Sequence, residues 1–453
     1  MSEKKLFKNV GTIFTADPEG RELKDGYVLV DGNVIEEVGN SPYEGPEPNE
    51  VIAGAGNVMI PGLINTHHHI FQTLFRNFKE VNNAKLFTWL TELYDRWAKI
   101  DTRAIHTSTV IGTAELLLSG ATTTSDHLYL FPEEQNNLFD EEIKAARETG
   151  IRFHPTRGSM SLSKEDGGLP PKKVVQTEEE IMKEYRRVID RYHDRERFAM
   201  TRVALAPCSP FSVTDDIMRE TAEIAEEENL ALHTHLAETA DETEFCLDEV
   251  GMRPVDYMES LGWLNERVWF AHVVHVNKEE IEKLSDAGVG MSHCPSSNMR
   301  LGSGIAPVVD MKDTDIDISM AVDGSASNDT SNMIKELRQA LLLQRVEYGA
   351  DSITPREVLR FATIGGARAL GREDELGSIE PGKAADLVMV DLNRLEYSGG
   401  LSDPVSALLM CDTKGVDFNM VNGEILVEDG ELKDRGILDY IPEQNEIAAQ
   451  FYS

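Results

Sequence analysis

The sequence predicts an α/β protein: a (β/α)8 TIM barrel with a small composite β-sandwich domain formed by the N- and C-terminal segments. Three observations support this prediction. Short strands occupy both ends of the chain, eight apolar strand candidates lie between them, and helical patterns separate several of the eight. Strands that alternate with helices over ~300 residues are typical of a parallel barrel.

Both ends of the chain are rich in short strands. Tyr27 to Gly39 holds two alternating runs around Asp31-Gly32-Asn33, which is a hairpin signal. Near the other end, Ala385 to Leu392 reads as a buried strand and Val421 to Leu432 as a second hairpin. Short strands of this kind cannot bury a core alone, so we expect the two ends to combine. The predicted domains are 1–59 with 371–453 for the sandwich, and 60–370 for the barrel.

The middle region supplies the candidate barrel strands. They are MIPGLINTH, GATTTSDH, IRFHPTRG, RVALAPC, LALHTHLAE, VWFAHVVHV, GVGMSHCP and DISMAVDG. Helix starts are visible between and after them. Thr214 precedes two acidic residues, and Thr354 precedes a proline at the first helical position.

The composition excludes several classes of protein. The 453 residues carry 44 Lys+Arg against 80 Asp+Glu, a formal net charge of −36, which argues against nucleic-acid and anionic-membrane binding. The acid excess is spread along the chain, and indicates either a solvated surface or adaptation to high salt. We see neither a membrane span nor a secretory signal. Four scattered cysteines suit a reducing cytoplasm.

Histidines near the ends of two candidate strands suggest a metal site. In Asn65 to His69, His67 and His69 share one face of the strand while His68 points away. Two imidazoles on one face can hold a metal ion, and His235 in the fifth strand can be a third nitrogen ligand. The alternatives are a chance cluster and ordinary core histidines.

An aspartate closes the eighth strand. Asp323 follows an apolar run, where a carboxylate is costly to bury unless it is paired or bound to a metal. It suits a fourth ligand or a base, with a helix N-cap as the alternative. The fourth strand offers no bridging lysine, so we expect a single divalent ion with an open position, Zn²⁺ first and Fe²⁺ second.

Two further residues suggest catalysis at this metal. Glu238 lies three residues past His235, where an acid that does not bind the metal can shuttle protons. His272 ends the sixth strand and is either a satisfied core histidine or a catalytic group. A non-catalytic metal-binding scaffold would have no need of Glu238.

The motifs PGLINTHHH, HTHLAE, AHVVH, SHCPSSN and VDGSASND together resemble the amidohydrolase superfamily in its mononuclear aminohydrolase branch. The resemblance implies the barrel with its composite sandwich and a homo-oligomer. It also implies the site residues. The metal ligands would be His67, His69, His235 and Asp323, and the catalytic groups Glu238, His272 and Asp323.

Further stretches, including HHHIFQTLFRN and HCPSSNMRLGSGIAPV, closely resemble the bacterial 8-oxoguanine deaminases. Isoxanthopterin deaminases and s-triazine hydrolases share several of them. The implied function is metal-dependent hydrolytic deamination of an amino-substituted N-heterocycle, 8-oxoguanine to urate and ammonia, with a pterin or a hydroxyatrazine-type triazine as the alternative substrate. Guanine deaminases carry an Arg-bearing stretch where Pro207 to Pro210 stand here, which disfavours plain guanine.

Three residues are predicted to contact the small heterocyclic substrate. The Gln72 amide suits the edge of a purine-like ring, Trp89 would stack on it or pack in the core, and His127 would bind an exocyclic oxygen. Asn298 and Arg300 would shape the mouth of the pocket.

Overall fold

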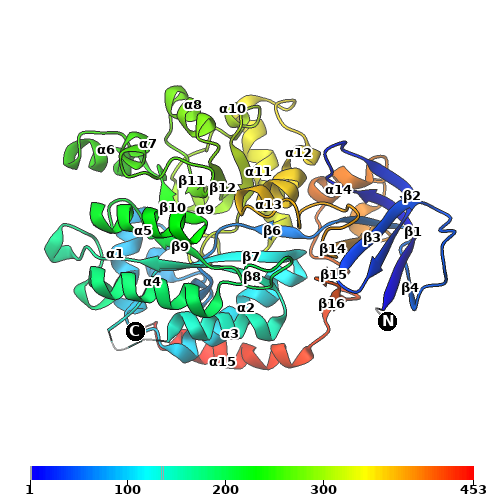
Figure 1. The fold of residues 1–453 in the computed structure, drawn as a ribbon, viewed down its shortest axis with the longest axis horizontal. Coiled ribbons are helices and arrows are strands. Elements are labelled where there is room, and N and C mark those ends of the chain that lie inside the picture. The colour runs from blue at the N-terminus through cyan, green and yellow to red at the C-terminus, as the bar shows by residue number, and fades with distance from the viewer. Residues whose placement is uncertain (1–2, 134, 136, 453) are drawn as a thin grey trace.

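The computed structural model describes residues 3–133, 135 and 137–452, and contains a closed barrel and a mixed sheet (Figure 1). The eight parallel barrel strands are β6 (Leu63–Asn65), β7 (Ala121–Leu128), β8 (Arg152–Ser159), β9 (Ala204–Pro207), β10 (Leu232–Leu236), β11 (Val268–His272), β12 (Gly290–His293) and β13 (Asp317–Met320). Pairing of Met320 with Asn65 closes the ring. Each predicted segment supplies one strand, so the predicted fold class is confirmed.

Helices cover the outside of the barrel (Figure 1). They are α1 (Leu86–Trp97), α2 (Thr102–Leu118), α3 (Leu138–Thr149), α4 (Glu178–Tyr192), α5 (Asp215–Glu228), α6 (Ala240–Glu249), α7 (Pro254–Ser260), α8 (Lys278–Asp286), α9 (Pro295–Leu301), α10 (Val308–Met311), α11 (Met333–Tyr348), α12 (Pro355–Arg360) and α13 (Gly366–Ala369). The predicted helix starts are confirmed, because Thr214 caps α5 and Thr354 caps α12. A π-helical turn at Phe361–Gly365 joins α12 to α13.

The two ends of the chain form one mixed sheet. Its strands are β1 (Lys4–Phe14), β2 (Glu22–Asp31), β3 (Val34–Asn40), β4 (Glu50–Ala53), β5 (Asn57–Pro61), β14 (Leu387–Asp391), β15 (Phe418–Val421), β16 (Glu424–Glu428) and β17 (Glu431–Leu432). Antiparallel pairing of β5 with β14, with Met59 opposite Met389, joins the N-terminal strands to the C-terminal ones. Phe7, Val28 and Met420 fill the core of the sheet. Both predicted hairpins are present.

A single residue, Gly62, separates β5 of the sheet from β6 of the barrel. A side chain at Gly62 would collide with Thr122, whose Oγ1 lies 2.1 Å from the position of a Cβ atom, so the close approach of β5–β6 to β7 requires glycine.

The last helix lies against the barrel. While α14 (Pro404–Met410) belongs to the sheet side of Figure 1, α15 (Tyr440–Ala449) runs beneath α2 and α3. Gln444 donates to Thr73 Oγ1 at 3.0 Å, and the rings of Phe451 and Phe75 lie 4.8 Å apart. We propose that the chain has two domains, 1–59 with 371–453 and 60–370, and that α15 of the first packs against the second. Within the described part of the chain, no helix is long and apolar enough to cross a membrane.

Candidate active site

Four predicted metal ligands converge at the C-terminal end of the barrel. His67 and His69 follow β6, His235 lies in β10, and Asp323 follows β13. His67 Nε2 lies 3.2 Å from Asp323 Oδ1, and His69 Nε2 lies 3.6 Å from the same oxygen. The Nε2 atoms of His69 and His235 are 3.1 Å apart. Active sites of such barrels form at this end, because the strand ends bring their side chains together there.

The other nitrogen of each imidazole is held by the protein. His69 Nδ1 donates to the carbonyl of His127 at 2.8 Å, and His235 Nδ1 donates to the carbonyl of Cys208. His233 lies one layer deeper. Its Nδ1 donates to the carbonyl of Trp269, so its Nε2 can only accept, at 2.7 Å, from Nδ1 of His67. The Nε2 atoms of His67, His69 and His235 therefore all carry lone pairs.

These lone pairs fit a bound cation. Two acceptors 3.1 Å apart repel each other unless a positive charge lies between them, and the buried Nε2 of His67 has no hydrogen-bond partner. Burial lowers the pKa of His67 and His69, and that of His235 to about 3, so the rings are neutral at ordinary pH. Neutral imidazoles fixed by a hydrogen bond on the far nitrogen are the form that ligates metals.

Glu238 and His272 lie beside this cluster. Glu238 Oε2 is 3.6 Å from His272 Nε2, which is in turn 4.0 Å from Asp323 Oδ2. Burial raises the pKa of Glu238. Burial lowers the pKa of His272, but the Glu238 and Asp323 carboxylates outweigh it, and the net shift is upward. An acid and an imidazole with raised pKa values, next to a ligand cluster, are suited to proton transfer.

The backbone at these positions is left-handed. Ala237, His272, Val273 and Asp323 have φ values of 52°, 75°, 49° and 59°. Non-glycine residues adopt this conformation rarely, and it concentrates at functional sites. Here it turns the chain sharply as each strand ends, which directs the side chains of Glu238, His272 and Asp323 inward.

A cavity opens above the cluster. Its walls are largely aromatic and aliphatic, with Leu86, Trp89, Leu90, Tyr94, Tyr129, Phe211 and Leu301, and its polar lining includes Gln72, Ser209, Glu238, Glu242, Asp323 and Ser327. Burial raises the pKa of Tyr94 and Tyr129, so both hydroxyls stay protonated and can donate hydrogen bonds.

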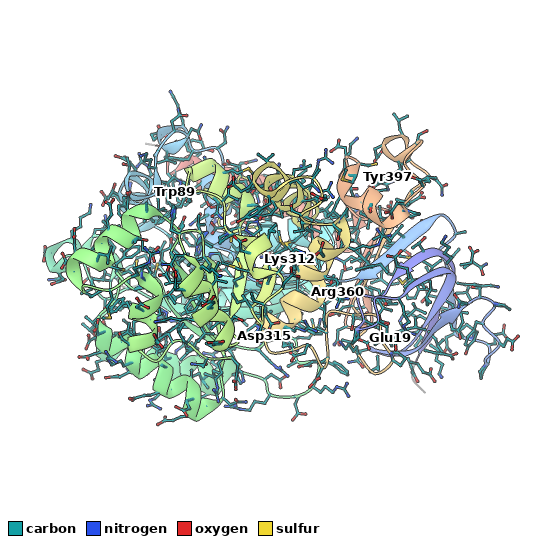
Figure 2. The ribbon with its side chains drawn as sticks, turned by 90° about the horizontal axis from the view of Figure 1, so that it is seen from above. Glu19, Trp89, Lys312, Asp315, Arg360 and Tyr397 are labelled. Atoms are coloured by element: carbon teal, nitrogen blue, oxygen red, sulfur yellow. The ribbon has the colours of Figure 1, made fainter. Side chains whose placement is uncertain are left out.

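The three predicted substrate contacts have different positions. Gln72 Oε1 accepts from the Ala326 N–H, while its buried Nε2 has no partner. Trp89 lies in the barrel half of the molecule, far from Glu19 beside the sheet (Figure 2), and its indole N–H donates to the Ala326 carbonyl at 3.2 Å. Both line the cavity. His127 is not among the lining residues.

His127 instead lies beneath the ligand histidines. Its Nε2 donates to the Ala206 carbonyl at 2.8 Å, and its ring stacks on His235 with the centroids 5.0 Å apart. Its ring therefore lies against the histidine cluster, and its contact with an exocyclic oxygen stays a prediction. Asn298, expected at the pocket mouth, is buried behind His272 and holds Nδ1 of that ring at 3.0 Å. Arg300 pairs with Asp329.

Sequence reasoning missed several lining residues. Tyr94 and Phe211 come from segments without a chemical motif, and only the fold brings them to the cavity. Glu242 could have been found from the sequence. Thr239 to Glu242 has the Thr-x-x-Glu pattern of a helix start, and this pattern comes directly after Glu238.

Comparison with known proteins agrees with this geometry. Residues 58–426 match the model of the amidohydrolase family. An 8-oxoguanine deaminase of Pseudomonas aeruginosa is 49% identical over 426 residues, 94% of each chain. An isoxanthopterin deaminase from an unknown prokaryotic organism is 35% identical, over 88% of this chain and 87% of its own. The atrazine chlorohydrolase of Arthrobacter aurescens TC1, solved in complex with zinc, superimposes with a TM-score of 0.94 at 32% identity, covering 98% of this chain and all of its own. The chain belongs to the amidohydrolase family.

Proposed function

We propose that this enzyme hydrolyses the exocyclic amine of 8-oxoguanine, giving urate and ammonia. The observation that carries the proposal is the 49% identity to an 8-oxoguanine deaminase across 94% of both chains. The shape of the cavity is consistent with it, since flat aromatic walls and a few hydrogen-bonding groups suit a planar, carbonyl-rich ring.

His67, His69, His235 and Asp323 would hold one divalent ion. They belong to two clusters of possible ligand atoms that share His67, one of which also contains His127 and the other His272. We propose Zn²⁺ because three imidazoles with a carboxylate suit it and a related structure contains zinc. When bound there, such an ion lowers the pKa of a water molecule toward neutrality and so supplies the nucleophile.

The protein side chains would move the protons. Asp323 accepts a proton from the attacking water, and Glu238, whose pKa is raised by burial, protonates the ring nitrogen next to the amine-bearing carbon. His272 donates a hydrogen bond to the oxygen that joins this carbon. The carbon gains a C–O bond and loses its C–N bond to the amine, which leaves with the proton from Asp323 as ammonia. The proton that remains on the new oxygen passes to Glu238, which restores that acid and leaves an oxo group on the ring.

Substrate recognition would depend on Gln72 and Trp89. The free Nε2–H of Gln72 can donate to a ring carbonyl, and Trp89 offers an aromatic face whose orientation is fixed by its bond to Ala326. A pterin is the second candidate substrate, because isoxanthopterin has the same kind of amine and the relative that acts on it is 35% identical. Triazines are the third.

We also propose a homo-oligomer, as the resemblance implies, and a cytoplasmic location. The free state of all four cysteines supports the location.

The direct test is ammonia release by purified protein of known metal content, in low and high salt. The substrates are 8-oxoguanine, guanine, isoxanthopterin, cytosine and hydroxyatrazine. We expect the highest kcat/KM with 8-oxoguanine. Hydroxyatrazine carries alkylamino groups, so its turnover is followed by the release of alkylamine. Faster turnover of isoxanthopterin or hydroxyatrazine would contradict 8-oxoguanine as the preferred substrate, and release of no amine from any of the five would refute the proposed function.

A further inference from the structure

Helix α6 begins with a variant of a common helix cap. In a capping box, the third helical residue is an acid whose carboxylate accepts from the N–H of the N-cap residue. Among the described residues the complete box occurs in the pairs Ser163/Asp166, Thr177/Glu180, Asn277/Glu280 and Thr354/Glu357. At α6, Thr239 is the N-cap and Glu242 the third residue, so the sequence has the same pattern.

The Glu242 carboxylate has different partners from those four. Thr239 Oγ1 still accepts from the Glu242 N–H, at 3.4 Å. The two Glu242 oxygens, however, accept from the N–H groups of Ala237 and Glu238, each at 2.8 Å. The side chain is 2% exposed and lines the cavity. A cap alone requires neither this burial nor these partners.

These two hydrogen bonds fix a strained peptide. Ala237 has a φ of 52°, and its carbonyl accepts from the N–H groups of Val274, at 3.0 Å, and His275, at 2.8 Å. Those residues lie two and three positions after His272. Ala237 is therefore held by Glu242 through its N–H and holds the loop after β11 through its carbonyl. Hydrogen bonds thus connect Glu242 through the backbone of Ala237 to Val274 and His275, and the backbone of Val273 leads from there to His272.

We propose that Glu242 is a positioning residue for the reaction, which holds Glu238 and, through Ala237, the His272 loop in the geometry that keeps the two side chains 3.6 Å apart. The proposal rests on the proposed function of Glu238 as the proton donor. Both carboxylate oxygens of Glu242 are occupied by backbone N–H groups, so it acts through Glu238 and not on the substrate directly.

The test compares Glu242→Gln with Glu180→Gln. Glu180 makes an ordinary capping box at α4, far from the cavity, and its oxygen accepts from Thr177 N–H at 2.9 Å. The amide of Gln keeps one acceptor and turns an NH₂ group toward the other N–H. We expect kcat of Glu242→Gln to fall about 100-fold with KM unchanged, because a displacement of about 1 Å has an effect of that size. Glu180→Gln should keep the wild-type kcat.

Backbone amide exchange gives a readout that needs no substrate. In Glu242→Gln we expect the amides of Ala237, Glu238, Val274 and His275 to exchange about 10-fold faster than in the wild type, as loss of one hydrogen bond implies. Glu180→Gln should change exchange only at α4.

Two results would overturn the proposal: an unchanged kcat in Glu242→Gln, or faster exchange confined to α6 with no change at Val274 and His275. If the wild type deaminates none of the five substrates, the proposed function fails, and amide exchange alone decides whether Glu242 holds both loops.

Discussion

Among the described residues, buried charges are paired with each other at the N-terminal end of the barrel, and they converge without a Lys or Arg partner at the C-terminal end. At the N-terminal end, fully buried Arg152 at the start of β8 forms an ion pair with Asp386, and Arg202 pairs with Glu375 at 2.7 Å. At the C-terminal end, His67 and His69 direct lone pairs toward Asp323, and no Lys or Arg of the described residues pairs with this carboxylate. Paired charges fix a structure, whereas convergent unpaired groups prepare a site for a ligand. We therefore expect changes at the N-terminal end to affect stability and changes at the C-terminal end to affect ligand binding and turnover.

The largest effect is expected from removal of a ligand at the C-terminal end. His67→Asn should lose the metal and reduce ammonia release below detection. Loss of a group that only hydrogen-bonds to a metal ligand lowers metal affinity by about 10–100-fold, and loss of the ligand itself should lower it further. Metal content after dialysis and ammonia release check this. The control lies in the same histidine triplet. His68→Asn should keep its metal, since His68 bonds to Ser331 and points away from the cluster. Metal loss from both variants alike would contradict the assignment.

The matched change at the N-terminal end should affect stability and not turnover. Arg152→Met leaves the Asp386 carboxylate buried without its partner, which costs about 3–5 kcal/mol in the free energy of unfolding. The double variant Arg152→Met/Asp386→Asn removes the orphaned charge and should recover part of the loss. Denaturant unfolding and kcat/KM at low temperature measure both properties. A fall in kcat at unchanged stability would break the division between the two ends.

A buried acid at the catalytic end predicts a pH dependence. Glu336 accepts from the Ser296 N–H and the Asn328 amide, and burial raises its pKa to about 7 from 4.5. The folded state then holds a proton that the unfolded state has lost, so this group makes stability fall as pH rises from 4.5 to 7. Glu336→Gln lacks this effect. Its unfolding free energy should gain about 3 kcal/mol relative to wild type as the pH rises from below 5 to 8.

The pH experiment has its control in Glu180, whose hydrogen bonds to Thr177 lower its pKa. The difference in stability between Glu180→Gln and wild type should therefore stay constant between pH 5 and 8. If the difference in stability between Glu336→Gln and wild type is also constant, the pKa of the Glu336 carboxyl is not raised in the folded protein.

The smallest effect is expected in the cavity wall. Trp89→Phe removes the hydrogen bond to Ala326 and loosens one aromatic wall, so KM should rise about 10-fold with kcat nearly unchanged. Trp263 is a matched control. It is buried, its indole N–H donates to the Met218 carbonyl at 2.9 Å, and it does not line the cavity, so Trp263→Phe should leave KM unchanged. Steady-state kinetics with the best substrate of the panel measure KM for both variants, and an equal rise in KM in both would contradict a specific role of Trp89.

The sequence predicted the barrel well because its strands carry strong local signals. All eight apolar segments form strands. His67 and His69 lie beyond the end of β6, and both rings face Asp323, on one side as their spacing predicted. The positions of residues without a local sequence signal could not be predicted. Phe211 reaches the cavity only through the fold, and His127 could not be placed under His235 because the stacking of two strand ends depends on register across the barrel. Glu242 looked like an ordinary cap, since the sequence does not show which N–H groups its carboxylate chooses.

The most direct test of the account is Glu238→Gln, assayed for metal content and for ammonia release on the same preparation. His67, His69, His235 and Asp323 would hold the ion, whereas Glu238 would move the proton without binding the metal. We therefore expect a metal content equal to that of the wild type and a kcat reduced by about 10²–10⁴-fold. Near-normal turnover, or loss of the metal together with activity, would contradict this division of roles.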